Sequence, residues 1–281
     1  MADLQGTTFL VTGANTGIGR STATELARRG AKVVLACRSR AKAEPVMAYI
    51  SAQTGNDALE FLALDLADLE SVRSAAGDFL SRDEPLHVLI NNAGVAGQRG
   101  QTAQGFELAF GINHLGHFLF TTLLLDHLKQ SGPARIVNVS SDSHYQAKGI
   151  DWDEVRQPTK GITGLHEYGV SKLCNVLFTQ ELARRLPPTE VTAYALHPGV
   201  IASDIWRRMP APVRLVMKLF MKSTDEGSMT TLHCATSPAL AGTSGRFYVK
   251  SAEKDASPVA SPGLAKELWE RSEAWTAPAS S

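Results

Sequence analysis

Residues 8–19, near the amino terminus, read Thr8-Phe-Leu-Val-Thr-Gly-Ala-Asn-Thr-Gly-Ile-Gly19. The apolar, β-branched run from Thr8 to Thr12 predicts a buried strand, and the segment from Ile18 to Arg29 predicts a helix. Glycines 13, 17 and 19 would permit a tight turn, the approach of a pyrophosphate to the backbone and close packing of helix on strand. Free N–H groups at the helix start would bind phosphate. An ordinary turn with three glycines is the alternative, but the strand–loop–helix setting favours a dinucleotide-binding loop.

The same alternation of strand-like and helix-like segments continues along most of the chain. Further strands are predicted at residues 32–36, 58–64, 87–90, 135–139, 191–196 and 247–249. Helices are predicted at residues 40–52, 106–129 and 171–185, and another follows the strand at 58–64 and ends at residue 80. Buried strands separated by helices are typical of a parallel sheet that is covered on both faces. The sequence therefore predicts an α/β fold, a single Rossmann-type domain with a doubly wound, mostly parallel seven-stranded sheet and helices on both faces.

No Pro/Gly/Ser-rich linker divides the chain, so we expect residues 1–281 to form one domain. Residues 200–228 are apolar and basic and are predicted to form a lid over the substrate. Residues 205–222 carry five basic residues and no acid, so peripheral contact of an amphipathic helix with an anionic membrane is the competing interpretation. Residues 251–281 are predicted to be a C-terminal extension with a short helix at 264–269.

The end of the second predicted strand indicates which dinucleotide binds. NAD enzymes place an acid there, about 20 residues beyond the glycine loop, to hold the ribose hydroxyls. Here Cys37 is followed by Arg38, and no acid occurs between Lys32 and Glu44. A guanidinium binds a 2′-phosphate that a carboxylate would repel, so we predict NADP(H) as cofactor, with Arg38 as its main contact. A solvated basic turn is the alternative.

A candidate acid/base pair opens the predicted helix after residue 167. Tyr168 and Lys172 are four residues apart, so they lie on one helical face. At ~4 Å and an effective dielectric of ~20, an ammonium stabilises a phenolate by ~4 kcal/mol, which would bring the tyrosine pKa from ~10 toward neutrality. Such a phenol would suit general acid/base chemistry. Ser140-Ser141 ends a strand, where open α/β sheets bind their ligands.

These residues, in this order, resemble the short-chain dehydrogenases/reductases over nearly the whole chain. The matching motifs are Thr12-Gly-x-x-x-Gly-Ile-Gly19, Asp65-Leu66, Asn91-Asn-Ala-Gly94, Asn113, Ser140-Ser141, Tyr168-x-x-x-Lys172 and His197-Pro-Gly199. The resemblance implies a catalytic tetrad of Asn113, Ser141, Tyr168 and Lys172. Ser141 would hydrogen-bond the substrate oxygen and Tyr168 would transfer its proton. Lys172 would lower the tyrosine pKa and hold the nicotinamide ribose, and Asn113 would hold a water that links Lys172 to solvent.

The resemblance also implies the residues that bind the cofactor. Residues Asp65 and Leu66 would frame the adenine, and the segment from Pro198 to Ser203 would cover the nicotinamide. The full predicted set is Gly13, Asn15, Thr16, Gly17, Ile18, Gly19, Arg38, Asp65, Leu66, Asn92, Ala93, Gly94, Tyr168, Lys172, Pro198, Gly199, Val200 and Ser203. Thr16 departs from the family pattern, because many NADP-using relatives carry a basic residue there.

Three details resemble a subgroup, the retinol dehydrogenase-like reductases. They are Ala36-Cys-Arg38, Asn113-His-Leu-Gly-His-Phe118 and the long segment 142–167, which contains Ile150-Asp-Trp-Asp-Glu154. The implied activity is NADP(H)-dependent reduction of an apolar aldehyde or ketone, or oxidation of the alcohol. Two alternatives stay open: reduction of an activated carbon–carbon double bond, and a non-catalytic NADP-sensing protein that binds partners. No N-terminal anchor like that of the membrane-bound members is expected from the sequence, and this expectation argues against a retinoid substrate.

The composition of the chain indicates which kinds of partner and ligand are not expected. Lys plus Arg equals Asp plus Glu, 28 of each, which argues against nucleic acid. The three cysteines are far apart, as expected of reduced thiols in a cytoplasmic protein, and no metal site is predicted, because His114 and His117 have no further ligand at metal-binding spacing. No signal peptide or transmembrane segment is expected, since the apolar run 118–125 is short. By analogy with relatives, a homodimer would form through helices at 115–129 and 171–185.

Overall fold

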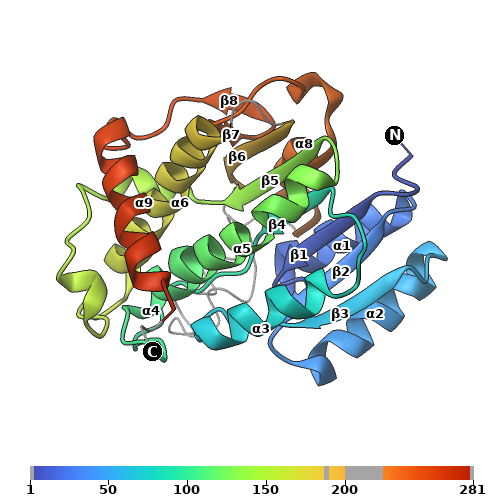
Figure 1. Ribbon diagram of the computed structural model, residues 1–281, viewed down its shortest axis with the longest axis horizontal. Helices are drawn as coiled ribbons and strands as arrows, with labels where there is room; N and C mark the ends of the chain where they lie inside the picture. Colours follow the sequence, from blue (N-terminus) through green and yellow to red (C-terminus); the bar gives the residue numbers. More distant parts are fainter. Residues whose placement is uncertain (1–2, 187–189, 200–223, 279–281) are drawn as a thin grey trace.

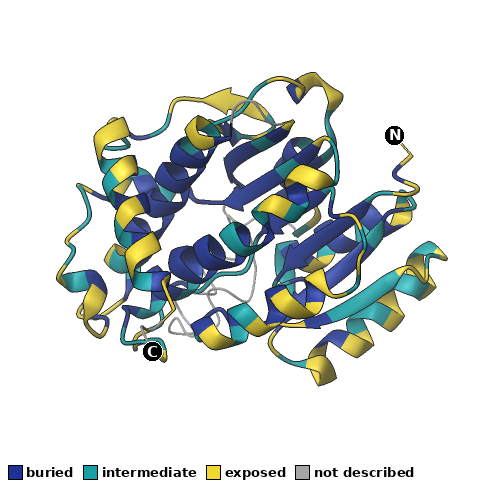
Figure 2. Cartoon of the chain, in the orientation of Figure 1, coloured by how far each residue is buried: buried dark blue, intermediate teal, exposed yellow. Residues whose placement is uncertain are grey.

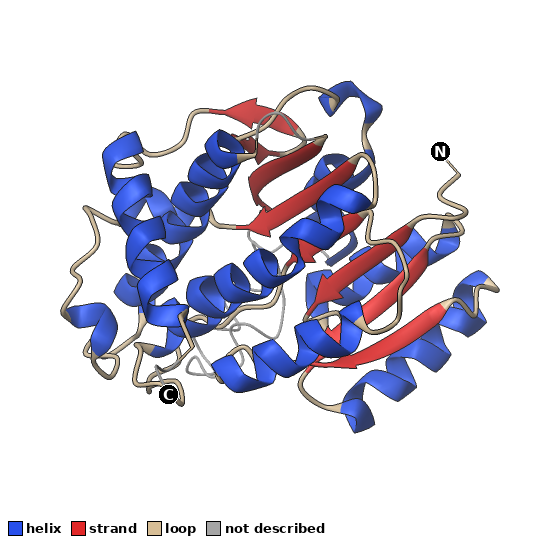
Figure 3. Cartoon of the chain, in the orientation of Figure 1, coloured by secondary structure: helices blue, strands red, loops and turns tan. Residues whose placement is uncertain are grey.

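A computed structural model describes residues 3–186, 190–199 and 224–278, and within them the chain forms an eight-stranded sheet covered by helices on both faces (Figure 3). The strand order is β3-β2-β1-β4-β5-β6-β7-β8. All neighbouring pairs are parallel except β7 and β8, which run antiparallel. The strands are β1 (Thr8–Thr12), β2 (Lys32–Cys37), β3 (Leu59–Ala63), β4 (Val88–Asn91), β5 (Ala134–Val139), β6 (Val191–His197), β7 (Arg246–Val249) and β8 (Ala252–Lys254).

Helices alternate with the strands along the chain (Figure 1). The α-helices are α1 (Gly17–Arg28), α2 (Arg40–Thr54), α3 (Leu69–Leu80), α4 (Leu108–Phe110), α5 (Gly116–Gln130), α6 (Leu165–Arg185), α8 (Thr224–Thr236) and α9 (Pro262–Thr276). The other helical turns are η1 (Gly111–Leu115), η2 (Asp142–Gln146), η3 (Glu154–Arg156) and η5 (Pro238–Leu240). Asp68 and Ser261 cap the starts of α3 and α9 with their side chains, and Gly55 ends α2 in the left-handed conformation.

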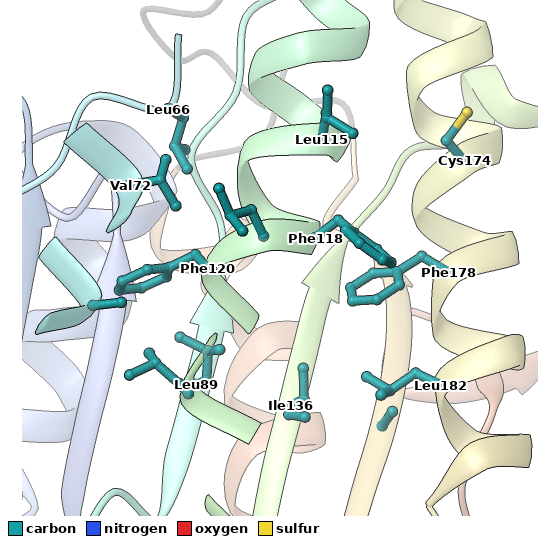
Figure 4. Close-up of a cluster of buried hydrophobic side chains, with 14 of the residues drawn as sticks. Leu66, Val72, Leu89, Leu115, Phe118, Phe120, Ile136, Cys174, Phe178 and Leu182 are labelled. Atoms are coloured by element: carbon teal, nitrogen blue, oxygen red, sulfur yellow. The ribbon is translucent and has the colours of Figure 1, made fainter. Parts of the chain in front are cut away.

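The sheet separates the two largest hydrophobic cores, and the central strands β2, β1, β4, β5 and β6 are buried (Figure 2). Helices α1, α2 and α8 cover one face, whereas α3, α5, α6 and α9 cover the other. Figure 4 shows side chains of the second core, where Phe118 and Phe120 of α5 meet Leu89 and Ile136 of the sheet. Burial on both faces explains why the strands read as continuous apolar runs rather than alternating ones.

The strand order reverses at β1, which lies between β2 and β4. At such a switch point the connections leave the sheet in opposite directions and open a crevice beyond the carboxyl ends of the strands. Thr12 ends β1 at this crevice, and the glycine loop follows it directly. The topology therefore places the predicted dinucleotide loop where a ligand can enter.

The expected α/β architecture is confirmed, but the predicted sheet of seven strands was one strand short. Strand β8 is only three residues long and fully exposed, so it carries no apolar pattern that would identify it. It follows β7 through Lys250 and Ser251, which both adopt positive φ angles in a tight turn.

The predicted C-terminal extension is an integral part of the fold. Its helix, α9, has 15 residues, longer than the short helix expected from the sequence. Trp269 of α9 is 5% exposed and packs at ring-centroid distances of 5.0 Å on Phe118 of α5 and 5.8 Å on Phe178 of α6. Helix α9 thus packs, within one chain, on part of α5 and α6, the two helices through which the sequence analogy predicts a dimer contact.

Helices α4, η1 and α5 form a continuous helical segment, Leu108–Gln130, that is long and apolar enough to cross a membrane by length and composition. The sequence interpretation had considered only the shorter run at 118–125. In the fold, 72% of the most apolar 18-residue stretch of this segment is buried, and the segment contributes to the core together with the sheet and α9. Its hydropathy is therefore that of a core helix.

The last five residues of the predicted lid, 224–228, belong to a helix. Residues 224–228 begin α8, in which Gly227 and Ser228 are buried, and Thr224 accepts a hydrogen bond from Ser21 of α1. These five residues belong to the helical layer on the sheet. The remainder of the lid, 200–223, lies outside the described residues.

Candidate active site

A cleft opens beyond the carboxyl ends of β1, β2 and β4. It brings together residues from five separated parts of the sequence: the glycine loop, the end of β2 with the start of α2, the residues after β3, the residues after β4, and η1. Twelve predicted cofactor residues line it, namely Gly13, Asn15, Thr16, Gly17, Ile18, Gly19, Arg38, Asp65, Leu66, Asn92, Ala93 and Gly94. The elongated set of lining groups fits a dinucleotide in chemistry, with a helix N-terminus for phosphates and a basic group at one end.

The glycine loop has a shape that requires glycine. Gly13 and Gly17 have φ angles of 66° and 55°, which residues with a Cβ rarely adopt. A Cβ on Gly19 would lie 2.4 Å from the carbonyl oxygen of Gly13, so any side chain there would force the helix away from the strand. The loop therefore keeps its backbone at the surface of the cleft, where phosphate oxygens can reach its N–H groups.

The β2 end of the cleft is basic. The Arg38 side chain is 69% exposed, and its Nη1 lies 4.0 Å from a carboxylate oxygen of Asp65, which is a weak pair at this exposure. Lys42, one helical turn further along, lines the same cleft, as does Ser39, whose side chain makes no capping hydrogen bond to α2. The sequence analysis missed Lys42. The signal that could have identified it is its position in the first turn of the helix that follows Arg38.

Further lining residues carry no sequence signal of their own. Cys37, Val95, Gln98 and Ile112 reach the cleft from the strand ends and from η1. Their side chains are common residue types in unremarkable patterns, so only the fold shows that they meet here. Burial raises the pKa of the Cys37 thiol to about 11, which keeps it protonated and unreactive.

The predicted acid/base residues meet at the end of β5. Tyr168 lies in the first turns of α6, is 6% exposed and shares a hydrogen bond between its phenol and the Ser141 side chain. The neighbouring serine has another task, because the Ser140 hydroxyl donates to the carbonyl oxygen of Lys172 at 2.7 Å. The structure thus separates the two serines and brings Ser141 to the tyrosine.

Lys172 lies one helical turn beyond Tyr168 and is buried. Its Nζ donates a 2.9 Å hydrogen bond to the carbonyl oxygen of Val139 and lies 5.6 Å from the centroid of the Tyr168 ring. Burial lowers the pKa of Lys172 to about 7. This ammonium is therefore easily deprotonated, unlike that of an exposed lysine.

The direction of the tyrosine shift differs from the sequence expectation of a strongly lowered pKa. Burial raises the pKa of the Tyr168 phenol, and the hydrogen bond with Ser141 lowers it by less. Removal of a phenolate from water costs more than the one hydrogen bond returns. In the described structure Tyr168 is thus a protonated phenol.

Asn113 joins these residues to the cleft. It lies in η1, a π-helical turn, and is fully buried. Its side-chain oxygen accepts from the Val95 N–H at 2.8 Å, and its Nδ2 donates to the Val95 carbonyl at 3.0 Å and to Ser171 Oγ at 2.9 Å. A Cβ placed on Gly94 would lie 3.1 Å from Asn113 Oδ1 and 3.5 Å from Lys172 Nζ. The floor of the cleft at Gly94 is therefore in contact with two of the four predicted catalytic groups.

The residues after β6 approach the same place. Ser140 donates its N–H to the carbonyl oxygen of Leu196 at 2.7 Å, so the end of β6 lies beside the end of β5. Pro198 and Gly199 follow directly, and His197 Nε2 lies 3.4 Å from a carboxylate oxygen of Asp142. The other two predicted nicotinamide contacts, Val200 and Ser203, lie outside the described residues.

Within the described part of the chain, no group of three or more His, Cys, Asp or Glu side chains could hold a metal ion. His114 and His117 point to different partners, Ser272 and Thr12, at 3.0 Å and 2.8 Å. They are buried core histidines with separate hydrogen bonds.

The amino-acid sequence matches the family model described as short chain dehydrogenase over residues 7–151. It is 45% identical over 270 residues to retinol dehydrogenase 12 of Homo sapiens, with 95% of this chain and 85% of the relative covered. Identity to dehydrogenase/reductase SDR family member 13 of Bos taurus is 43% over 279 residues, with 97% and 74% covered.

Solved structures of other proteins have a similar fold. The fold is similar to that of an uncharacterized protein from Mycobacterium Paratuberculosis, with a TM-score of 0.79, 33% identity and coverage of 98% of this chain and 95% of that one. It is also similar to a 3-ketoacyl-(acyl-carrier-protein) reductase from Brucella melitensis complexed with NADH, with a TM-score of 0.66, 27% identity and coverage of 86% and 96%.

Proposed function

The chain belongs to the short-chain dehydrogenase/reductase family, in the group resembling retinol dehydrogenases, and on this premise we propose that it transfers hydride between NADP(H) and an apolar carbonyl or alcohol. Oxidation and reduction of alcohol and carbonyl groups is the chemistry of this family. The observation that carries the proposal is the arrangement of three side chains. Tyr168 shares a hydrogen bond with Ser141, and Lys172 Nζ lies 5.6 Å from the Tyr168 ring centroid and close to Gly94, which lines the dinucleotide cleft.

In the direction of reduction, a bound NADPH would supply the hydride that the carbonyl carbon accepts. The Ser141 hydroxyl hydrogen-bonds the carbonyl oxygen, and the Tyr168 phenol gives its proton to that oxygen, which becomes the hydroxyl of the alcohol. A phenolate is left on Tyr168, and a protonated Lys172 stabilises it through space. Oxidation reverses these steps.

The protonation state of the site supports this role. Burial keeps Tyr168 protonated in the resting protein, so a proton is available for a developing alkoxide. Lys172, with a pKa of about 7, can gain or lose a proton near physiological pH and restore the phenol after turnover. Asn113 and Val139 would hold the lysine environment in place.

The preference for NADP over NAD rests on the β2 end of the cleft. Arg38 is exposed and only weakly paired with Asp65, so its guanidinium can turn to a 2′-phosphate without breaking a strong contact. Lys42 supplies a second positive charge on the same side. Many relatives carry a basic residue at the position of Thr16. Because Thr16 has no charge, Arg38 and Lys42 would be the main contacts of the 2′-phosphate.

The substrate class follows from the retinol dehydrogenases among the relatives and is a small apolar aldehyde, ketone or alcohol. We also propose that residues 200–223 contribute to a lid over this substrate, with contact to a membrane surface as the alternative.

A cytoplasmic location is in line with the three cysteines, which are buried free thiols. A homodimer, where formed, would have to use a surface other than the face of α5 and α6 that α9 covers.

The test is oxidation of NADPH by the purified protein against a panel of carbonyls, from short aliphatic aldehydes to retinal and steroid ketones, with NADH in parallel. We expect turnover of apolar carbonyls and a lower KM for NADPH than for NADH. Binding of NADPH without turnover of any carbonyl would refute the proposed reaction, and equal use of NADH would refute the cofactor preference.

A further inference from the structure

His117 of α5 is a buried histidine that lies between the glycine loop and Asn113. It is 2% exposed, its Nε2 is 2.8 Å from Thr12 Oγ1, and its Nδ1 is 3.0 Å from the carbonyl oxygen of Asn113. Thr12 precedes the first glycine of the loop, and Asn113 belongs to the predicted tetrad. One imidazole ring thus connects two parts of the site that are about 100 residues apart in sequence.

The partners of Thr12 determine which ring nitrogen carries the proton. A hydroxyl has two lone pairs and one O–H. The Thr12 oxygen already accepts the N–H groups of Asn92 and Ala93, both at 2.9 Å, so only its own proton is left to share. That proton goes to His117 Nε2 at 2.8 Å, because the other acceptor, the Ile90 carbonyl, is 3.4 Å away. The imidazole proton must then lie on Nδ1, which donates to the Asn113 carbonyl.

Asn113 lies in a π-helical turn, which affects the hydrogen bonds that its backbone can make. In the π-helical turn η1 the Gly116 N–H donates to the Gly111 carbonyl, five residues back, instead of the four of an α-helix. The wider turn shifts the backbone register at this point, and the Asn113 carbonyl accepts a side-chain N–H. The Asn113 side chain is meanwhile bound to Val95 and Ser171.

The hydrogen bonds form a continuous chain with a fixed direction. The N–H groups of Asn92 and Ala93, which line the cofactor cleft, donate to Thr12, Thr12 donates to His117, and His117 donates to Asn113. We propose that His117 is a positioning residue that couples the dinucleotide loop to the backbone of Asn113, a member of the predicted tetrad. This inference rests on the proposed function, because it assigns His117 a role in the same site.

The charge of the site agrees with a neutral ring. Burial lowers the pKa of His117 to about 4, the hydrogen bond to Asn113 partly opposes this, and the nearby Lys172 lowers it further. A second positive charge would face Lys172 in the same desolvated space. A proton on Nε2 would also point at an oxygen whose lone pairs are both in use.

Two substitutions separate the two ends of the ring. In His117→Gln the side-chain carbonyl can take the place of Nε2 as acceptor for Thr12, whereas in His117→Asn the side-chain N–H can take the place of Nδ1 as donor to Asn113. We expect His117→Gln to bind NADPH within about twofold of the wild type and to lose about tenfold in kcat. We expect His117→Asn to retain kcat within about threefold and to bind NADPH about tenfold more weakly.

His114→Gln is the matched control. His114 precedes His117 by three residues. It is fully buried, and its Nε2 lies 3.0 Å from Ser272 Oγ of α9 rather than in the site. The variant should melt at a lower temperature with kcat and NADPH affinity within about twofold of the wild type. The proposal is overturned when the two His117 variants change no more than the control, or when both lose kcat and affinity to the same extent.

A measurement without turnover distinguishes this inference from the proposed function. In nitrogen-15 NMR of the histidine rings, His117 should show the Nδ1–H tautomer and stay neutral down to about pH 5. An Nε2–H tautomer, or titration near pH 6.5, would overturn the inference. If the wild-type protein reduced no carbonyl, the proposed function would fail, while the tautomer and the NADPH affinities would still decide the role of His117.

Discussion

At the scale of single residues, burial sets the chemistry of the site more than pairing does. The sequence shows that Tyr168 and Lys172 share a helical face, and pairing alone would give a tyrosine with a low pKa. In the folded protein both side chains are desolvated, so the phenol keeps its proton and the ammonium loses its own easily. Sequence spacing gives the neighbours of a group but not the water that surrounds it.

The pKa of Lys172 gives a prediction for the pH dependence of reduction. Its pKa is lowered to about 7, so the charged form is present below this pH and is lost above it. We expect kcat/KM for carbonyl reduction to fall as the pH rises through about 7, because an uncharged Lys172 no longer stabilises the phenolate. A rate that stays constant from pH 6 to pH 9 would contradict the assignment.

Arg38 gives a prediction for cofactor choice. In Arg38→Ala we expect the KM for NADPH to rise about tenfold or more and the KM for NADH to stay nearly unchanged, since only the former has a 2′-phosphate. Arg40→Ala is the control, because Arg40 is equally exposed, at 66%, but pairs with Glu44 and does not line the cleft. Equal weakening of the two cofactors would show that Arg38 does not bind the phosphate.

At the scale of elements, the glycine loop gives the sharpest prediction. In Gly19→Ala the new Cβ would lie 2.4 Å from Gly13 O and 2.5 Å from Asn92 Nδ2, so the start of α1 must move. We expect a loss of NADPH binding by at least about tenfold, measured by nicotinamide fluorescence. The control is Gly77→Ala in α3, where nothing lies within 4 Å of the new Cβ. It should leave cofactor binding unchanged and stabilise the protein by up to about 1 kcal/mol; similar binding losses in both variants would refute the argument.

Elements with strong local patterns were predictable, and those without them were not. The strands β1 and β2 have apolar runs whose limits the sequence gives to within one residue. Strand β8 is three exposed residues, and its pairing with β7 depends on a turn at Lys250 and Ser251 that no composition rule indicates. The second half of α9 was missed because the polar stretch Glu270-Arg-Ser-Glu273 follows Trp269, and Trp275 packs on the core only when the helix meets the rest of the fold.

At the scale of the whole molecule, the two halves of the site come from opposite sides of the switch point at β1. The glycine loop and Arg38 belong to the β1–β2 side of the switch point, whereas Ser141, Tyr168 and Lys172 belong to the β5–α6 side. Motif order predicted that these residues meet. The contacts between the halves, through Gly94, Asn113 and His117, involve sequence separations that only the fold can reveal.

The attachment of α9 to the body of the protein gives a stability prediction. Trp269 packs on Phe118 and Phe178, and the Arg185 guanidinium lies 4.5 Å from its ring centroid. We expect Trp269→Ala to lower the free energy of unfolding by about 3 kcal/mol or more in urea denaturation. Trp269→Phe is the control and should cost much less, because it keeps the ring packing and removes an indole N–H that is buried without a partner. A loss below about 1 kcal/mol in Trp269→Ala would show that α9 contributes little to the fold.

The central claim is that Tyr168 completes a hydride transfer from NADPH to a carbonyl carbon. The measurement that tests it most directly uses NADPH that carries deuterium at both C4 positions and follows the label into the product of an apolar aldehyde, with the wild-type protein and with Tyr168→Phe. We predict deuterium on the carbinol carbon with the wild type, and a rate at least about a hundredfold lower with Tyr168→Phe, which should still bind NADPH. A product without deuterium, or an undiminished rate in the variant, would contradict the claim.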